Sequence, residues 1–408
     1  MKKIVSIAAA GILALAVGAE QSKDYVKTEI TSKDRAMPTF YESLRERMPF
    51  SLGWKDGANP KKWRKAGLAK AREIIIQEND TTPFEMAELD EERRDGYTAK
   101  RIVFNISRDS RVLAYLLVPD GAKNAPAALM LHAHGSEFRI GKEQMVRPIN
   151  ATDMEELPDD ADEEQKAAAK KLNVALSWAS KYYDDEDNEG CFPGDELAKR
   201  GYVVLAIDAL GWGDRGVDGF KTDSQQALAS NLFNLGTSFA GIIAQEDCRA
   251  AKFLASLPMV DKKRVAAVGF SMGAFRAWQV AAISDDITAG IANCWMATMK
   301  GLMVIGNNQL KGQSAFSMLH PFIARYLDYP DVAGLAAPKP MLFFNGTEDP
   351  LFPVESVKES YAKMHKIWTA NKADEKLHTE IIEGVGHEFR PAQRKSAFDW
   401  LDKQFGNN

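Results

Sequence analysis

A single serine stands between two glycines in the segment GFSMGAFRAW, residues 269–278, directly after the apolar run 265–268. Where a strand turns sharply into a helix, the two elements come so close that only glycine fits two residues before and two residues after the turn. Gly269 and Gly273 occupy these positions around Ser271. The turning residue is strained by about 1–3 kcal/mol, a cost that persists where function needs it. The pattern predicts a nucleophilic hydroxyl presented on a tight turn.

A serine hydroxyl is a weak nucleophile unless an imidazole accepts its proton and a carboxylate orients the imidazole. Among six histidines, His387 lies in the loop GVGHEF after the last expected strand, whereas the others fall in strands, a helix or an inserted segment. The segment KPMLFFNGTEDPLFP supplies a strand followed by Asp349, with Glu348 as the near competitor. The order Ser271, Asp349, His387 predicts a catalytic triad. A surface histidine and a simple turn aspartate are the alternatives.

Acyl transfer also needs hydrogen-bond donors for the oxyanion that forms at the attacked carbonyl. We expect one donor to be the backbone N–H of Met272, at the start of a helix. The second should come from the segment LMLHAHGSEF, where Gly135 or Ser136 could turn an N–H inward. His132 and His134 share one face of the same strand, but the sequence offers no nearby third ligand, so we predict no metal site.

The elements around these residues alternate between apolar strands and helices from residue 97 onward. Two opening strands should form a hairpin, and the rest imply a mostly parallel sheet with right-handed crossovers and ligands at its carboxyl edge. The sequence therefore predicts an α/β fold with a central sheet flanked by helices. Strands are expected at 100–106, 112–118, 127–132, 202–207, 265–270, 287–295, 340–344 and 378–382, and helices at 244–257, from 272 and at 391–405.

The N-terminus carries the features of an export signal. Two lysines precede an apolar run over 4–17, and small residues follow where a signal peptidase cuts. The run is shorter than the roughly 20 residues that span a bilayer. We predict a signal peptide over 1–19 and a secreted or periplasmic mature protein without a membrane span. An uncleaved anchor is the alternative.

The remaining chain divides into a helical N-terminal extension over 20–96 and a catalytic domain over 97–408. Residues 136–190 form an insertion between a strand and a helix, with acidic runs at 153–164 and 184–189. We interpret this insertion as a solvated surface excursion, with a lid or a calcium site as the alternatives. Its acidic character would favour a hydrated, uncharged alcohol such as a sugar beside the site.

Composition limits the partners. The net charge is −5, and no basic stripe is evident, which argues against nucleic acid. Three cysteines, Cys191, Cys248 and Cys294, provide neither a disulfide framework nor a zinc site, and we expect Cys248 and Cys294 to be buried structural thiols. No cofactor is implied.

Four segments, CFPGDELAKRGYVVLAIDALGWGDRG, GFSMGAFRAW, NGTEDPLFP and GVGHEF, resemble strand-end motifs of the α/β-hydrolase superfamily, in its acetyl xylan esterase-like branch related to dienelactone hydrolases. The resemblance covers about residues 97–405. It implies hydrolysis of small acyl esters, acetyl esters of polysaccharides above all, through an acyl-enzyme. Dienelactone hydrolases have a cysteine where this chain has Ser271, many relatives have a glycine in place of Ala274, and HAHG replaces the glycine-rich loop of lipases.

Two tryptophans follow strand ends on either side of the nucleophile strand. Trp212 and Trp295 are candidates for stacking on a sugar ring, with packing in the core as the alternative. Two other functions remain open at this point: a peptidase or broad-specificity hydrolase on the same fold, and a carbohydrate-binding protein with an inactive triad.

Overall fold

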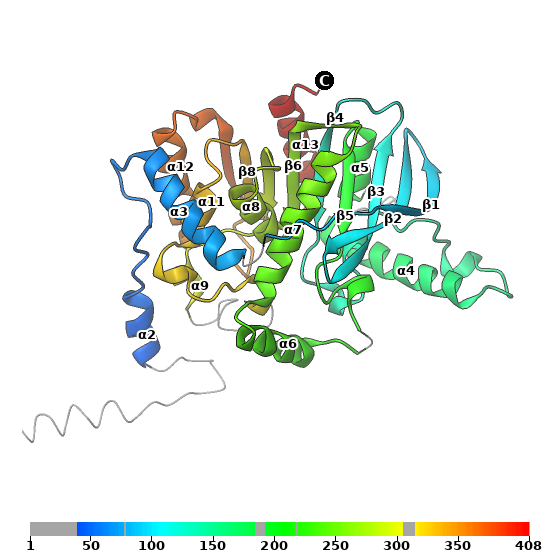
Figure 1. Cartoon of the computed structure of the whole chain (residues 1–408), viewed down its shortest axis with the longest axis horizontal. Helices are drawn as coiled ribbons and strands as arrows, with labels where there is room; N and C mark the ends of the chain where they lie inside the picture. The colour runs from blue at the N-terminus through cyan, green and yellow to red at the C-terminus, as the bar shows by residue number, and fades with distance from the viewer. Residues whose placement is uncertain (1–38, 77–78, 184–191, 218, 305–314, 408) are drawn as a thin grey trace, which may run out of the picture.

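One nine-stranded mixed sheet organises the computed structural model, which describes residues 39–76, 79–183, 192–217, 219–304 and 315–407 (Figure 1). The strand order is β1-β2-β3-β5-β4-β6-β7-β8-β9. The first three pairs in this order are antiparallel and the other five are parallel. The strands are β1 (Ala87–Arg94), β2 (Tyr97–Ser107), β3 (Ser110–Pro119), β4 (Ala125–Leu131), β5 (Val203–Ile207), β6 (Val260–Phe270), β7 (Ala289–Asn293), β8 (Met341–Gly346) and β9 (Leu377–Ile382).

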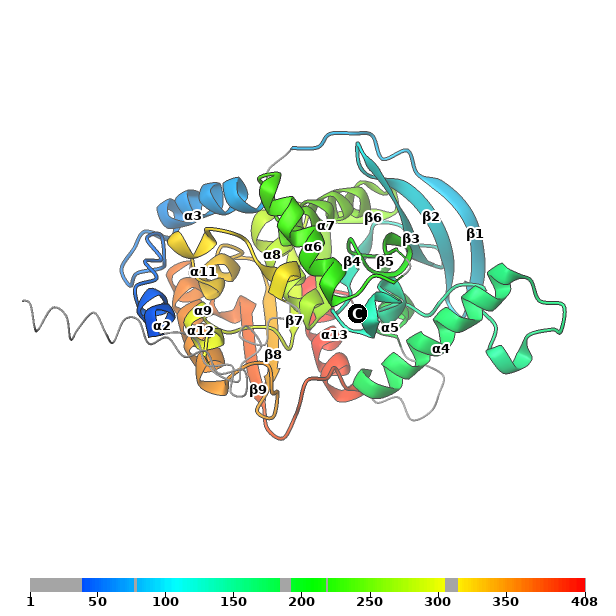
Figure 2. The ribbon, with the colours of Figure 1, turned by 90° about the horizontal axis from the view of Figure 1, so that it is seen from below.

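Helices cover both faces of the sheet. The described helices are α2 (Thr39–Glu46), α3 (Pro60–Ile75), α4 (Glu163–Tyr183), α5 (Pro193–Lys199), α6 (Thr222–Asn234), α7 (Phe239–Ser256), α8 (Met272–Ile283), α9 (Met299–Leu302), α11 (Tyr329–Gly334), α12 (Val354–Ala370) and α13 (Pro391–Phe405). Helices α3, α7, α8, α11 and α12 bury their apolar sides in one core, and α4, α5 and α13 do so in a second core across the sheet (Figure 2).

The central strands are apolar on both sides because both faces of the sheet are covered. In β4, Ala127, Leu129 and Leu131 belong to one core, while Ala128 and Met130 belong to the other. Continuous apolar runs are typical of such doubly covered parallel strands. This arrangement confirms the predicted α/β fold, and every strand and helix expected from the sequence is present, with α13 at its predicted bounds.

The predicted helical extension also contains an edge strand. Residues 20–96 include the helices α2 and α3, but β1 occupies 87–94 and pairs with β2. Its sequence, AELDEERR, shows no alternation of apolar residues, because most of the strand is exposed to solvent. Its pairing with β2 depends on backbone hydrogen bonds. Charged edge strands are common because they discourage pairing with other chains. The predicted signal peptide, 1–19, lies outside the described residues.

The insertion at 136–190 is not a surface excursion throughout. Ile140 and the stretch 142–146 are buried, and α4 packs one side into the core with Leu172, Ala175 and Tyr183. Within the described part of the insertion, only the turn before α4 and the first part of that helix project from the body (Figure 2). The acidic runs dominate the composition of the insertion, so composition alone does not reveal this apolar pattern. The second acidic run, at 184–189, lies outside the described residues.

Among the residues that the structure describes, no single helix is both long and apolar enough to cross a membrane. One bent pair, 223–234 with 239–256, meets the length and composition requirements jointly, and its two helices meet at 84°.

Candidate active site

Ser271 occupies the turn between β6 and α8 with φ 56° and ψ −122°, outside the ordinary regions for a non-glycine residue. The flanking glycines are required by contact. A Cβ on Gly269 would lie 2.0 Å from the carbonyl oxygen of Gly273, and one on Gly273 would lie 1.8 Å from that of Leu131. The backbone is therefore held in the strained turn by the packing of α8 against β4 and β6, as the spacing predicted.

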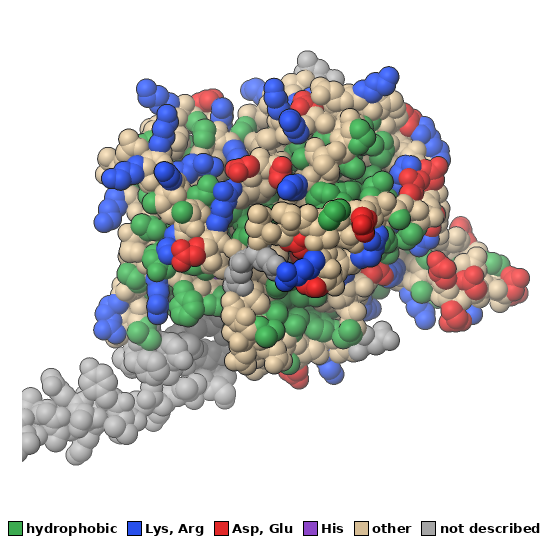
Figure 3. Space-filling view, in the orientation of Figure 1, with side chains coloured by type: hydrophobic (Ala, Val, Ile, Leu, Met, Phe, Trp, Pro, Cys, Tyr) green, Lys and Arg blue, Asp and Glu red, His purple; other side chains and the backbone are tan. Residues whose placement is uncertain are grey.

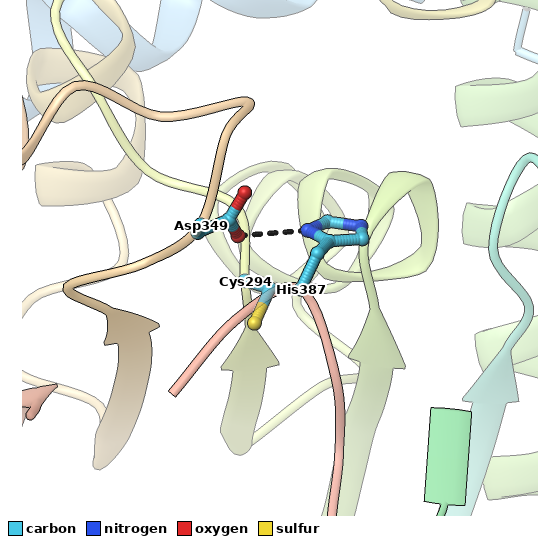
Figure 4. Close-up of side chains that lie close together, drawn as sticks. All are labelled: Cys294, Asp349 and His387. Atoms are coloured by element: carbon cyan, nitrogen blue, oxygen red, sulfur yellow. Dashed lines mark hydrogen bonds and ion pairs between the residues drawn. The ribbon is translucent and has the colours of Figure 1, made fainter. Parts of the chain in front are cut away.

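His387 lies between the serine and a buried carboxylate. Its Nε2 is 2.7 Å from Ser271 Oγ, and its Nδ1 is 2.7 Å from Asp349 Oδ2. Asp349 is buried, whereas the competitor Glu348 is exposed. The structure thus brings the three predicted triad residues together. The carboxylate that contacts the imidazole is that of Asp349 (Figure 4).

Two loops position the acid and the base by pairing with each other. The backbone N–H of Thr347 donates to Ile382 O at 3.0 Å, and that of Glu348 donates to Val385 O at 2.9 Å. A Cβ on Gly346 would lie 1.9 Å from Val385 O, so the two loops approach more closely than any residue but glycine allows. Asp349 Oδ1 accepts the N–H of Leu351 at 2.9 Å, which leaves Oδ2 for the imidazole.

Aromatic rings confine the imidazole. The ring centroid of His387 is 5.0 Å from that of Phe270 and 6.2 Å from that of Phe352, which it meets nearly parallel. Phe352 in turn contacts Trp295. A packed ring of this kind holds one rotamer and keeps Nε2 directed at the nucleophile.

The oxyanion donors stay a prediction, although their neighbourhood is defined. Met272 is the first residue of α8, where a backbone N–H has no acceptor within its own helix. Gly135 packs against Trp178, since a Cβ there would lie 2.1 Å from the indole. Ser136 and the two residues after it all have positive φ, and Ser136 Oγ donates to Ile140 O at 2.8 Å. This loop is tightly folded beside the end of β4.

Gln144 ties the loop together from within. Its Oε1 accepts the N–H of Ala133 at 3.0 Å, and its Nε2 donates to Ile140 O at 3.1 Å. The side chain of Gln144 is fully buried, so each of these bonds replaces a lost bond to water. The sequence had placed Gln144 within a solvated insertion and did not identify this role.

A closed charge network lies behind the same loop. We call Lys142, Glu143, Asp208 and Asp214 the Lys142 cluster. Lys142 Nζ is 2.7 Å from Asp208 Oδ2 and 3.0 Å from Glu143 Oε1, and it also pairs with Asp214. The backbone N–H of Lys142 donates to Asp208 Oδ1 at 2.6 Å.

Burial and pairing act in opposite directions within this cluster. Burial alone would lower the pKa of Lys142, but the carboxylates of Asp208 and Glu143 raise it well above its usual value. Burial opposes ionisation of Asp214, yet Lys142 and Lys171 hold the pKa of that carboxyl well below its usual value. Lys142 and Asp214 therefore stay charged, and the ion pairs of the cluster join the loop after β4 to the segment after β5.

Trp212 and Trp295 are packed in the core, the alternative that the sequence had left open, and neither presents a face for a sugar. Trp212 is fully buried and its Nε1 donates to His134 O at 2.7 Å. Trp295 is 2% exposed and its Nε1 lies 3.0 Å from Met318 Sδ. A tryptophan after a strand end could either stack on a sugar or pack in the core, and only its burial in the structure distinguishes the two roles. Both indoles therefore act as packing residues around the site.

The two strand histidines are structural. His132 is fully buried, with Nδ1 2.8 Å from Ala133 O and Nε2 accepting the N–H of Ala209 at 2.9 Å. Burial lowers the pKa of His134 to about 4, and its ring contacts Trp212 and Phe138. Both rings are neutral near neutral pH and engaged with protein partners.

Helix α4 brings two further aromatic residues that the sequence did not identify. Trp178 packs on Gly135, and the half-buried Tyr182 lies with its ring centroid 4.2 Å from that of Trp178 and 5.8 Å from that of Phe270. The carbonyl of Tyr182 accepts the N–H of Phe389 at 2.8 Å, two residues after His387. From the sequence we had interpreted this segment as part of a solvated insertion and predicted no helix there.

Cys294 is the other unanticipated neighbour. It follows β7, has φ 59°, and its side chain is buried beside Asp349 and His387 (Figure 4). Its Sγ lies 3.4 Å from Glu388 O, and burial together with the Asp349 carboxylate raises the pKa of the thiol well above its usual value. The thiol is therefore protonated and is not the nucleophile.

This arrangement can carry out nucleophilic catalysis. A hydroxyl on a strained turn, an imidazole within hydrogen-bond distance and a buried carboxylate on its far nitrogen match the geometry of serine hydrolases. Such a site activates the hydroxyl without a metal or an organic group, because the imidazole accepts the proton as the bond to the carbonyl forms.

The chain belongs to the abhydrolase family of α/β-hydrolases, because the model of that family matches residues 32–366, most of the sequence. It is also 23% identical over 325 residues to YtaP of Bacillus subtilis (strain 168), whose name assigns it only to the hydrolases. That match covers 79% of this chain and 94% of YtaP.

Solved structures share the fold at low identity. The structure of a protein assigned as an acetyl xylan esterase, from Bacteroides fragilis NCTC 9343, aligns with a TM-score of 0.62 and 15% identity, over 86% of this chain and 84% of that one. A glucuronoyl esterase from Solibacter usitatus aligns with a TM-score of 0.56 and 14% identity, over 86% and 95%. At these identities the likeness establishes a common architecture.

Proposed function

We propose that this chain is an exported serine esterase that removes small acyl groups, acetyl above all, from polysaccharides through an acyl-enzyme. The observation that carries the proposal is the continuous chain of contacts from Ser271 Oγ through His387 to Asp349, both at 2.7 Å. An intact triad of this kind argues against a protein that only binds carbohydrate.

In the first half of the reaction, Ser271 Oγ attacks the ester carbonyl while His387 Nε2 accepts the hydroxyl proton. Asp349 Oδ2 accepts the hydrogen bond from Nδ1–H and so stabilises the imidazolium that forms. The backbone N–H of Met272, with a second donor from Gly135 or Ser136, would bind the developing oxyanion. His387 then donates its proton to the leaving alcohol, and a water molecule releases the acid by the reverse sequence.

The choice of substrate rests on likeness to esterases and on the sequence resemblance described above. Among proteins of this architecture are an acetyl xylan esterase, a glucuronoyl esterase and a methylesterase. All three are named as ester hydrolases, which favours an esterase over a peptidase. Export, which the predicted signal at 1–19 would provide, fits polymeric glycans as substrates.

The acidic insertion no longer supports a sugar substrate. The acidic run at 153–164 lies at the projecting end of α4 and in the turn before it (Figure 3). Tyr183, at the other end of α4, is separated from Glu163 by about 30 Å of helix. Only the Tyr183 end adjoins the triad. We therefore assign contact with the substrate to the half-buried Tyr182 and not to Trp212 or Trp295.

A labelling experiment and a substrate panel test the proposal. A fluorophosphonate probe should modify the wild-type protein and not Ser271→Ala. The panel should include acetylated xylan, methyl esters of glucuronate and peptides, because each represents one rival activity. Release of acetate from an acetylated glycan is expected. Cleavage of peptides without release of acetate would favour a peptidase.

A chain-length series tests the acyl specificity. For nitrophenyl esters, kcat/KM for acetate should exceed that for octanoate by at least about tenfold, which corresponds to roughly 1.4 kcal/mol of transition-state fit. A preference for octanoate would contradict the acetyl assignment and leave the serine hydrolase standing.

A further inference from the structure

Three residues at the triad offer metal-ligating atoms of different kinds within a small volume. Cys294 Sγ, an oxygen of Asp349 and a ring nitrogen of His387 all lie within 4.8 Å of one another (Figure 4). Cys294 reaches this position because its backbone at the end of β7 adopts φ 59°, a conformation that costs energy in a residue other than glycine. The strained turn places the thiol beside the catalytic acid.

The geometry points to an inhibitory site for a thiophilic divalent cation, Zn²⁺ or Cd²⁺, formed by Cys294, Asp349 and His387. Tetrahedral zinc binds sulfur at about 2.3 Å and nitrogen or oxygen at about 2.0–2.2 Å, which places neighbouring ligand atoms roughly 3.3–3.8 Å apart. The contact of 2.7 Å between His387 Nδ1 and Asp349 Oδ2 must therefore widen slightly, while the thiol sulfur, which lies within 4.8 Å of both, would have to approach by up to about 1 Å.

The fourth ligand can come from the backbone or from water. Glu388 O lies 3.4 Å and Gly386 O 3.9 Å from Cys294 Sγ, so two carbonyl oxygens already face the sulfur. The side chains of Cys294 and Asp349 are buried, while 15% of the His387 side chain is exposed to solvent. A cation would therefore enter past the imidazole.

Binding would stop catalysis by reversing the histidine tautomer. Both contacts are 2.7 Å long and match the serine-hydrolase arrangement, in which Nδ1–H donates to the carboxylate and Nε2 accepts the proton of the serine. A cation on Nδ1 needs that lone pair, so the proton moves to Nε2 and faces the serine. The thiol proton leaves to solvent. The imidazole then cannot act as the base, and Asp349 no longer orients it.

The test is inhibition of the full-length protein by Zn²⁺ and Cd²⁺, measured with nitrophenyl acetate and reversed with a chelator. We expect both cations to inhibit the wild-type protein and Mg²⁺ not to, because a thiolate is a poor ligand for a hard cation. In Cys294→Ser, half-inhibition should require at least about a tenfold higher concentration, judged against that variant's own metal-free rate.

Cys248 and Cys191 provide the matched controls. Cys248→Ser and Cys191→Ser should be inhibited at the wild-type concentration. If Cys294→Ser is also inhibited at that concentration, or if the Cys248 variant accounts for the sensitivity, the proposal is wrong. Resistance of the wild-type protein to both cations overturns it as well.

A binding measurement makes the test independent of the enzymatic activity. Ser271→Ala keeps all three ligands, and Cd²⁺ added to it should produce the ultraviolet absorption of a cadmium–thiolate bond. Asp349→Asn in the same background should weaken this binding by about tenfold or more. Equal binding by both proteins refutes the site, whatever the natural substrate proves to be.

Discussion

The triad and the Lys142 cluster both place polar side chains beyond the carboxyl ends of parallel strands of the same sheet. Ser271 and Asp349 follow β6 and β8, whereas Lys142 and Asp208 follow β4 and β5. The surroundings differ. Lys142 and Asp208 are fully buried, while His387 keeps part of its ring exposed and Ser271 is only partly buried. The cluster pairs its charges with one another, and the triad keeps a reactive atom available.

The difference separates two uses of buried charge at one sheet edge. In the cluster, removing one partner leaves the remaining charges buried and unpaired. The loss therefore appears in the free energy of unfolding. In the triad, the hydrogen bonds keep the imidazole in the tautomer that the reaction needs, so its energy appears in the transition state. Substitutions in the two regions should therefore change different measured quantities.

The largest expected effect is on activity and comes from Ser271→Ala. Removal of the nucleophile should lower kcat for nitrophenyl acetate by about four orders of magnitude or more. The free energy of unfolding in urea should change by less than about 1 kcal/mol, because alanine keeps the same backbone and Cβ. Residual activity near the wild-type rate would remove Ser271 from the mechanism.

Asp349→Asn should follow closely, with a loss of about 10⁴-fold in kcat, since an amide favours the wrong tautomer of His387. The matched control is Glu348→Gln, one residue earlier and exposed, which should leave kcat nearly unchanged. Steady-state kinetics of the two variants decide the assignment. A larger loss in the Glu348 variant would show that the wrong carboxylate has been named.

Lys142→Met should show the opposite pattern. It leaves the carboxylates of Glu143, Asp208 and Asp214 together without their buried cation, and breaking a buried pair in this way costs about 3–5 kcal/mol. Urea unfolding should report this loss. A fully stable Lys142→Met protein would mean that the cluster does not hold the loop after β4.

Acid should destabilise the protein through its buried histidines. Burial lowers the pKa of His134 to about 4 and that of His320 to about 3, both below the ordinary value of 6.5. The unfolded chain therefore binds more protons than the folded chain below pH 6.5, and stability falls as the pH drops from 6.5 toward 4 and 3. The free energy of unfolding should depend more steeply on pH across this range in the wild-type protein than in His134→Gln. Equal slopes would contradict the assignment.

The smallest effect is expected for Lys171→Met. Lys171 also pairs with Asp214, but about a third of its side chain is exposed, at 31%. Partly exposed pairs contribute about 0.2–1 kcal/mol because water competes for both charges. The same urea assay should therefore separate Lys171→Met clearly from Lys142→Met. Equal losses would show that burial is not what distinguishes the two lysines.

The sequence by itself determined the order of strands and helices, the strained turn at Ser271 and the candidates for acid and base. These features are local, because a glycine pattern or an apolar run is imposed by contacts within a few residues. The order of elements then implied which strand ends share an edge. The sequence favoured Asp349 over its neighbour Glu348, and the pairing between the loops after β8 and β9 is what brings that carboxylate to the imidazole.

Only the tertiary structure decided the roles of residues whose neighbours are distant along the chain. Trp212 and Trp295 could face substrate or core, and their burial depends on the packing of other helices. Lys142 and Gln144 stand in a polar stretch, yet Asp208 and the folded loop enclose them. Strand β1 lacks an apolar pattern and forms through backbone pairing with β2. Composition describes a side chain, whereas burial and partnership belong to the whole fold, because they depend on which surfaces meet.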